Sequence, residues 1–182
     1  MKKGNQALII IDLQEIFFRH EEYHLHQHVS LVSHVNELIG YARQQKVPVI
    51  FVQHTDLKEE NELFKGKEDW KLYSGLDRIE EDPVFQKTKW DAFYKTDLLS
   101  YLQEKGIEQL IFAGAQTEFC LDTTIRMAYS LGYQNNIAFR DAHSTLSSSI
   151  MDAEMIIKHH ENVWNNRFVT LHSMKDAAQI FC

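Results

Sequence analysis

The stretch LIFAGAQTEFC, residues 110–120, passes from an apolar segment straight into a helix-like segment that continues to about Leu131. Its first four residues are typical of a buried strand. A cysteine placed where a strand turns into a helix lies near free backbone N–H groups and the positive end of the helix dipole. Both stabilise a thiolate, and the same N–H groups can hold a developing oxyanion. Cys120 is therefore a candidate nucleophile.

Apolar segments alternate with amphipathic helical segments along the chain. We expect strands at 7–11, 47–52, 84–87, 109–113, 136–140 and 168–171, and helices at 29–45, 96–105, 119–131, 149–164 and from 173 onward. Thr96 and Ser173 are candidate N-caps. Residues 54–82 are polar and show little periodicity, so we expect an excursion that carries an active-site loop or short helices.

Short apolar runs separated by helices indicate strands buried on both faces, which is typical of a parallel sheet covered by helices. In such a sheet, ligands bind beyond the carboxyl ends of the strands. Asp12, Lys87 and Cys120 each stand at the carboxyl end of a different expected strand. Taken singly, they have ordinary alternatives: a turn-forming acid, a solvated lysine and a buried thiol. Their conjunction favours one shared crevice.

Composition limits the classes of function. The 182 residues are 44% hydrophobic and 25% charged, ordinary values for one globular domain over residues 1–182. The formal net charge of −7 argues against a general nucleic-acid binder, which would carry a basic face. Two cysteines do not make a disulfide framework. We recognise no signal peptide and no membrane-spanning run, so we expect a cytoplasmic protein without a membrane partner.

Four segments, in order, resemble the isochorismatase-like cysteine hydrolases. This superfamily includes nicotinamidases, N-carbamoylsarcosine amidases, ureidoacrylate-type amidohydrolases and isochorismatases. The segments are ALIIIDLQ at 7–14, KTKWDAFYKTDL at 87–98, GAQTEFC at 114–120 with DTT at 122–124 and Ala128, and FRDA at 139–142. The resemblance covers nearly the whole chain. Four segments in order, at the separations found in the family, are specific evidence for that family. With the strand pattern, it leads us to expect a three-layer α-β-α fold with a six-stranded parallel sheet of Rossmann-like order.

The resemblance implies a catalytic triad of Asp12, Lys87 and Cys120. It also implies a cis peptide between Ala115 and Gln116, with the backbone N–H groups of Gln116 and Cys120 forming an oxyanion hole. The Cys120 thiolate, favoured by Lys87 and the helix start, would attack an amide or carbamoyl carbon. Asp12 would move the proton to the leaving nitrogen and then activate the water that resolves the thioester. No cofactor is expected. The family's habit predicts a homodimer or homotetramer in which a neighbouring subunit can close the pocket.

Several residues beside the triad are candidates for the binding of a small-molecule substrate. They are Gln14, Phe17, Trp90, Gln116 and Phe119, because each neighbours a triad segment. Core packing is the alternative for Phe17 and Phe119. Asp91 stands where the family usually has serine, which could alter the pocket near Trp90.

A metal site is not expected. Nicotinamidases of this superfamily usually carry an Asp-x-His pair after the second strand, whereas this chain has the reverse order, His54-Thr55-Asp56, with no clear third ligand. We interpret the histidines at 20–28 as a solvated polar entry to a helix. Three rivals to an amidohydrolase remain. They are an isochorismatase-type vinyl-ether hydrolase with Asp12 as the acid, a non-catalytic member of the fold, and, more weakly, a redox thiol protein, since Cys182 lies far from Cys120.

Overall fold

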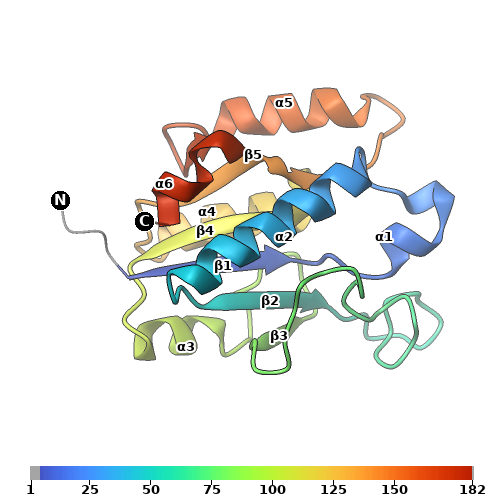
Figure 1. Cartoon of the computed structure of the whole chain (residues 1–182). Helices are drawn as coiled ribbons and strands as arrows, with labels where there is room; N and C mark the ends of the chain where they lie inside the picture. Colours follow the sequence, from blue (N-terminus) through green and yellow to red (C-terminus); the bar gives the residue numbers. More distant parts are fainter. Residues whose placement is uncertain (1–4, 182) are drawn as a thin grey trace.

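The computed structural model describes residues 5–181, and these contain a six-stranded sheet whose strands are all parallel (Figure 1). The order across the sheet is β3-β2-β1-β4-β5-β6. The strands are β1 (Gln6–Ile11), β2 (Val49–His54), β3 (Val84–Lys87), β4 (Gln109–Ala115), β5 (Ile137–Ser144) and β6 (Thr170–His172). This confirms the predicted fold class. The sheet reverses its direction of growth between β1 and β4, which is where such folds bind ligands.

Helices cover both faces of the sheet and complete three layers. The α-helices are α1 (Ile16–Arg19), α2 (His28–Gln44), α3 (Leu98–Glu104), α4 (Asp122–Ser130), α5 (Ala153–Trp164) and α6 (Ala177–Phe181). Two short 3₁₀ turns are η1 (Glu21–Tyr23) and η3 (Met174–Asp176), and η2 (Thr117–Leu121) is a π-helical turn. Figure 1 shows α2 and α6 in front of the sheet and α4 behind it. Among residues 5–181, no helix is long and apolar enough to cross a membrane.

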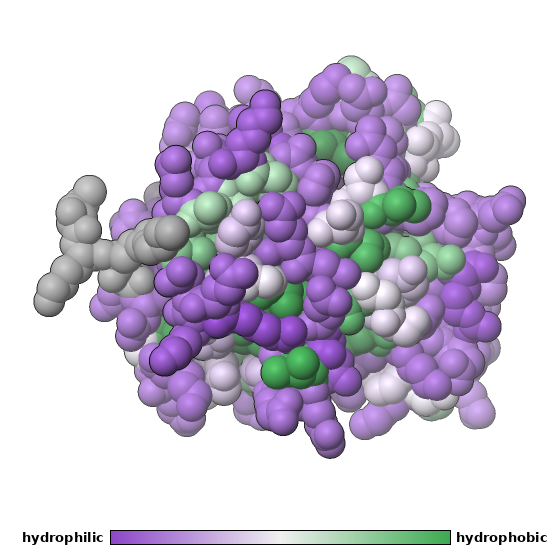
Figure 2. Space-filling model, in the orientation of Figure 1, coloured by the Kyte–Doolittle hydropathy of each residue, from purple (hydrophilic) through white to green (hydrophobic). Residues whose placement is uncertain are grey.

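Two apolar cores flank the sheet because alternate residues of each strand face opposite sides. Leu8 and Ile10 of β1 pack with α2 and α6, whereas Ile9 and Ile11 pack with α3, α4 and Trp164 of α5. All six residues of β1 are buried. The outer side of α2 is polar, and Figure 2 shows a largely hydrophilic surface on that face of the molecule. A rigid central strand therefore leads directly to Asp12.

Element boundaries differ from the predictions where local hydrogen bonds compete. The helix expected from Thr96 begins at Leu98. The Thr96 hydroxyl donates to the Ala92 carbonyl (2.6 Å) and accepts only a long hydrogen bond from the Leu98 amide (3.4 Å), so it caps the helix weakly. The helix expected from residue 149 begins at Ala153, after Asp152, whose carboxylate accepts from the Met155 amide (2.8 Å). Ser173 does cap, in a capping box that opens η3. The excursion after β2 contains no regular helix or strand before β3.

Gly114 allows β4 to pass close to β1. Its φ is +124°, and a Cβ there would overlap the Ile11 carbonyl oxygen and lie 2.6 Å from the Ile11 nitrogen. Gly114→Ala is therefore expected to destabilise the protein by about 3 kcal/mol or more, since neither backbone can move freely in a packed sheet. Urea unfolding measures this loss. Gly40→Ala is the control: nothing lies within 4 Å of its Cβ position in α2, and we expect a gain of about 0.5–1 kcal/mol. Equal effects of the two changes would contradict this explanation.

Candidate active site

The ammonium group of Lys87 joins an acid and a thiol at the carboxyl edge of the sheet. Its Nζ lies 2.6 Å from Asp12 Oδ2 and 3.2 Å from Cys120 Sγ, and it also donates to the Lys89 carbonyl oxygen (3.1 Å). The Lys87 side chain is fully buried and that of Asp12 is 5% exposed. Lys87 thus contacts both of the other residues singled out from the sequence, and the ligand atoms of Asp12 and Cys120 lie within 4.8 Å of each other. A catalytic unit in which these groups share a proton would need such an arrangement.

Backbone geometry at the strand ends places these groups. Asp12 follows β1 directly and adopts a left-handed φ of +48°, with its amide donating to the Val52 carbonyl (3.0 Å). Cys120 lies in η2, which follows β4 after a cis peptide between Ala115 and Gln116, as the resemblance implied. The oxyanion-hole role of the Gln116 and Cys120 amides stays a prediction.

Burial sets the protonation of the site. Burial alone lowers the pKa of Lys87, but Asp12 and then Cys120 raise it by more, so the net pKa lies above its ordinary value. Burial, followed by the negative charge of Asp12, raises the pKa of the Cys120 thiol well above its usual range, and the charge of Lys87 only partly offsets this. This direction is opposite to the lowered pKa that the helix start and Lys87 led us to expect, because burial and the charge of Asp12 together outweigh the charge of Lys87.

A cavity of about 250 Å³ opens above Cys120. Its lining includes every predicted substrate-site residue, together with His54 and Leu63: Asp12, Gln14, Phe17, His54, Leu63, Trp90, Gln116, Phe119 and Cys120. The ring centroids of Trp90 and Phe119 lie 5.1 Å apart. Trp90 is 56% exposed at the mouth of this cavity. Phe17 also packs against the core, which supports the packing interpretation, and its role in substrate binding stays a prediction. The cavity is apolar except at the triad end, which suits a small, partly planar substrate.

Gln14 lines the cavity, but its amide group is already engaged. It donates to the carbonyl oxygens of His54 (3.0 Å) and Trp70 (2.7 Å) and accepts from the His54 amide (2.8 Å). Trp70 belongs to the excursion between β2 and β3, so Gln14 pins that excursion against the end of β2. We therefore expect Gln14 to shape the wall of the cavity more than to bind substrate by its amide.

His54 is a wall residue that the sequence analysis considered only for metal binding. Its Nδ1 lies 3.3 Å from Lys87 Nζ, and its Nε2 lies 3.4 Å from Asp56 Oδ1. Burial and then the charge of Lys87 lower the pKa of His54, which favours the neutral ring. His54 ends β2, which lies between β1 and β3 in the sheet. The rule that parallel strands gather their carboxyl ends could therefore have identified it.

Asp12, His54 and Cys120 are the residues placed to hold a metal ion, since their ligand atoms lie within 4.8 Å of one another. The Lys87 ammonium contacts all three and supplies a positive charge at their centre. A cation would have to displace it, so this donor set fits a metal poorly. Of the N-terminal histidines, His20 contacts Asp69 (3.0 Å) and His24 contacts the Phe18 carbonyl (3.2 Å).

Asp91, the departure from the family's serine, has a structural partner. Its carboxylate accepts from the Phe93 amide (2.8 Å) and lines a neighbouring cavity with Trp90 and Tyr94. Burial raises the pKa of Asp91. Its side chain therefore lies beside the cavity above Cys120, in the segment that carries Trp90. Cys182 lies outside the described residues.

Comparisons with known proteins identify the family of this chain. A solved structure described as an isochorismatase family protein is 41% identical, covers 93% of this chain and 98% of its own, and superposes with a TM-score of 0.85. An Arabidopsis thaliana protein named a probable inactive nicotinamidase is 33% identical and covers 84% of this chain and 87% of its own. The ureidoacrylate amidohydrolase RutB of Pseudomonas syringae is 25% identical and covers 73% and 68%, respectively. The isochorismatase domain family matches residues 6–163. The chain therefore belongs to the isochorismatase family.

Proposed function

We propose that this protein is a cysteine hydrolase that cleaves an amide or carbamoyl C–N bond of a small molecule through a thioester on Cys120. The observation that carries the proposal is the contact of Lys87 Nζ with both Asp12 (2.6 Å) and Cys120 (3.2 Å) at the floor of the cavity. A buried lysine that bridges an acid and a thiol keeps the site close to neutral while a proton moves between them. The similarity to a ureidoacrylate amidohydrolase supports C–N chemistry.

The mechanism follows from the charges. Asp12 accepts the thiol proton, so the site gains no net charge while the sulfur becomes nucleophilic. The sulfur attacks the carbonyl carbon, and the amides of Gln116 and Cys120 receive the developing oxyanion. Protonated Asp12 then donates to the leaving nitrogen, and ammonia or an amine departs. Asp12 next takes a proton from water, which attacks the thioester. The acid product forms as the C–S bond breaks, and Asp12 returns the proton to the departing sulfur, which restores the thiol and the carboxylate. Lys87 stays charged throughout.

The cavity suggests how a substrate is held. Its volume of about 250 Å³ suits a small molecule. We propose that Trp90 and Phe119 pack on the planar part of that molecule, while its carbonyl group points to Cys120. Trp90 and Phe119, which line the cavity, are 56% and 37% exposed. We further propose a homodimer or homotetramer in which a second copy covers this rim.

Ammonia release from a panel of small primary amides and N-carbamoyl compounds tests the proposal. The wild-type protein should release ammonia from at least one compound, and Cys120→Ala should abolish that release because no thioester can form. Hydrolysis that survives in Cys120→Ala would contradict the thioester route. Cleavage of vinyl ethers without ammonia, dependent on Asp12 and not on Cys120, would favour the isochorismatase-type reaction.

A further inference from the structure

The turn that carries Cys120 is tied to neighbouring elements at both of its ends. Thr117, the first residue of η2, places its hydroxyl oxygen 2.9 Å from His143 Nδ1 of β5. Asp122, the first residue of α4, accepts from the Trp164 indole N–H of α5 (2.7 Å). Cys120 lies between these two anchors.

Packing alone holds the middle of this turn weakly. Thr117 and Leu121 are fully buried, but Phe119 is 37% exposed and Cys120 is only partly buried. Directional hydrogen bonds at the ends therefore have more control over where the sulfur lies. A displacement of about 1 Å at a reacting atom can cost about 100-fold in rate.

A bulge in β5 brings His143 to this position. Pairing between β4 and β5 shifts after Phe112, so that His143 stands opposite Gly114. The His143 side chain is fully buried, and its Nε2 lies 3.5 Å from Glu161 Oε1 of α5. Within residues 5–181, His143 Nε2 makes no hydrogen bond, and the Glu161 carboxylate is its charged neighbour.

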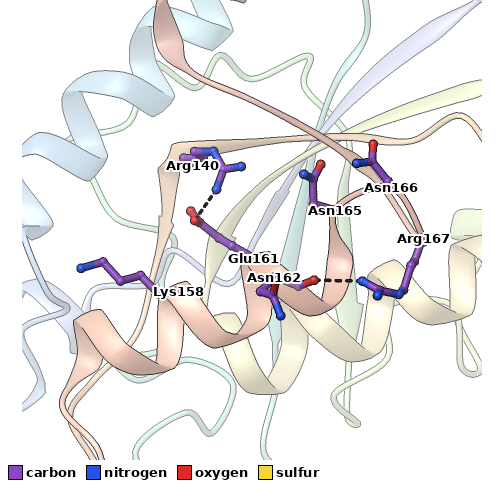
Figure 3. A pocket seen from close by; sticks show the side chains of 7 residues that line it. All are labelled: Arg140, Lys158, Glu161, Asn162, Asn165, Asn166 and Arg167. Carbon is purple, nitrogen blue, oxygen red and sulfur yellow. Dashed lines mark hydrogen bonds and ion pairs between the residues drawn. The ribbon is translucent and has the colours of Figure 1, made fainter.

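Glu161 is held from the other side by Arg140. Arg140 donates to the Glu161 carboxylate at 2.5 Å, and Figure 3 shows this pair within a cavity beside α5. Burial acts to raise the pKa of Glu161, but His143 and Arg140 outweigh it, so the net pKa is lowered and the carboxylate is charged. A charged Glu161 favours a proton on His143 Nε2, which leaves Nδ1 free to accept from the Thr117 hydroxyl.

We propose that Thr117 and His143 are positioning residues that hold the Cys120 sulfur against Lys87. This inference rests on the proposed function, because it assigns a role relative to a nucleophilic Cys120. Neither residue contacts the cavity, so neither is expected to bind substrate. Loss of their hydrogen bond should let the Cys120 sulfur move away from the Lys87 ammonium. The charge of Lys87 would then stabilise the Cys120 thiolate less.

Two substitutions at Thr117 separate positioning from packing. Thr117→Val keeps the shape and loses the hydroxyl, whereas Thr117→Ser loses a methyl group and keeps the hydroxyl. The measurement is the rate constant for iodoacetamide alkylation of Cys120 from pH 6 to 10, by peptide mass spectrometry on the intact folded chain, with Cys182 as the reference thiol. At pH 8 we expect Thr117→Val to react at least threefold more slowly than wild type, and Thr117→Ser to match wild type. A packing role alone predicts the reverse, and that result would overturn the proposal.

His143 provides a second route if Thr117→Val does not fold. His143→Asn keeps a polar atom near the Nδ1 position and should retain the wild-type profile, whereas His143→Leu should slow alkylation as Thr117→Val does. His159→Asn, at an exposed position of α5, is the matched control. A wild-type profile that Lys87→Met leaves unchanged would overturn both the proposed function and this role. A Lys87-dependent profile that survives in Thr117→Val and His143→Leu would overturn the positioning role alone.

Discussion

Asp12→Asn is expected to make Cys120 react faster with alkylating agents while the protein loses its hydrolytic activity. The Asp12 carboxylate raises the pKa of the Cys120 thiol, after burial, and Lys87 lowers it. Removal of the carboxylate leaves the ammonium with only the thiol to stabilise, so the pKa falls and more thiolate is present at pH 7–8. The amide cannot accept the thiol proton or protonate the leaving nitrogen, so turnover should fall by about 10²–10⁴-fold.

The pH dependence of alkylation measures the first effect, and ammonia release measures the second. The midpoint for Asp12→Asn should lie at lower pH than that of wild type. Asp77→Asn removes an exposed carboxylate and serves as the control, with an unchanged profile expected. An Asp12→Asn protein with the wild-type midpoint, or with undiminished turnover, would show that Asp12 is not coupled to the thiol.

Lys87→Met is expected to lose both activity and stability. Methionine fills similar space, but it leaves Asp12 as a buried carboxylate without its partner, because the Lys87–Asp12 pair is almost fully buried. Breaking a buried pair in this way costs about 3–5 kcal/mol. The thiol also loses the one charge that lowers its pKa, so alkylation of Cys120 at pH 8 should slow relative to wild type.

The pH dependence of stability identifies the cause. In the wild type, Asp12 holds the pKa of Lys87 above its ordinary value. The pair therefore contributes fully below about pH 10, and its contribution is lost as the pH rises through the Lys87 pKa of the folded state. In Lys87→Met, acidification from pH 8 to 5 should recover part of the lost stability, because protonation removes the unpaired charge. Urea unfolding at both pH values measures this recovery. An equal loss of unfolding free energy at pH 8 and pH 5 would show that lost packing, and not the unpaired charge, is the cause. Lys71→Met, at an exposed lysine, is the control.

The sequence was enough to predict the fold and the meeting of Asp12, Lys87 and Cys120. Continuous apolar strands require burial on both faces, and the carboxyl ends of parallel strands share one edge. The meeting of three side chains at those ends could therefore be predicted without knowledge of any distance. The cavity residues Phe17, Trp90, Gln116 and Phe119 followed from the same reasoning, because each adjoins one of those ends.

Other features depend on tertiary contacts that a linear pattern does not contain. The polar residues after Arg140 predicted the end of a strand. Strand β5 instead continues through a bulge past Asp141, and the bulge brings His143 to η2, the turn that carries Cys120. The protonation of Cys120 also required the structure. A helix start and a lysine argue for a lowered pKa of the Cys120 thiol, but burial and then the charge of Asp12 raise that pKa by more than Lys87 lowers it.

The measurement that tests the thioester route most directly is the mass of the Cys120-containing peptide after acid quenching during turnover. With a compound that releases ammonia, we predict an adduct on Cys120 whose mass equals that of the substrate minus its leaving group, which is ammonia for a primary amide and ammonia or the amine for an N-carbamoyl compound. The adduct should form before the product and be lost as the substrate is exhausted. The adduct should not form in Asp12→Asn, which cannot protonate the leaving group. Turnover with Cys120 unmodified at every quench time, and retained in Cys120→Ala, would contradict the cysteine-hydrolase function.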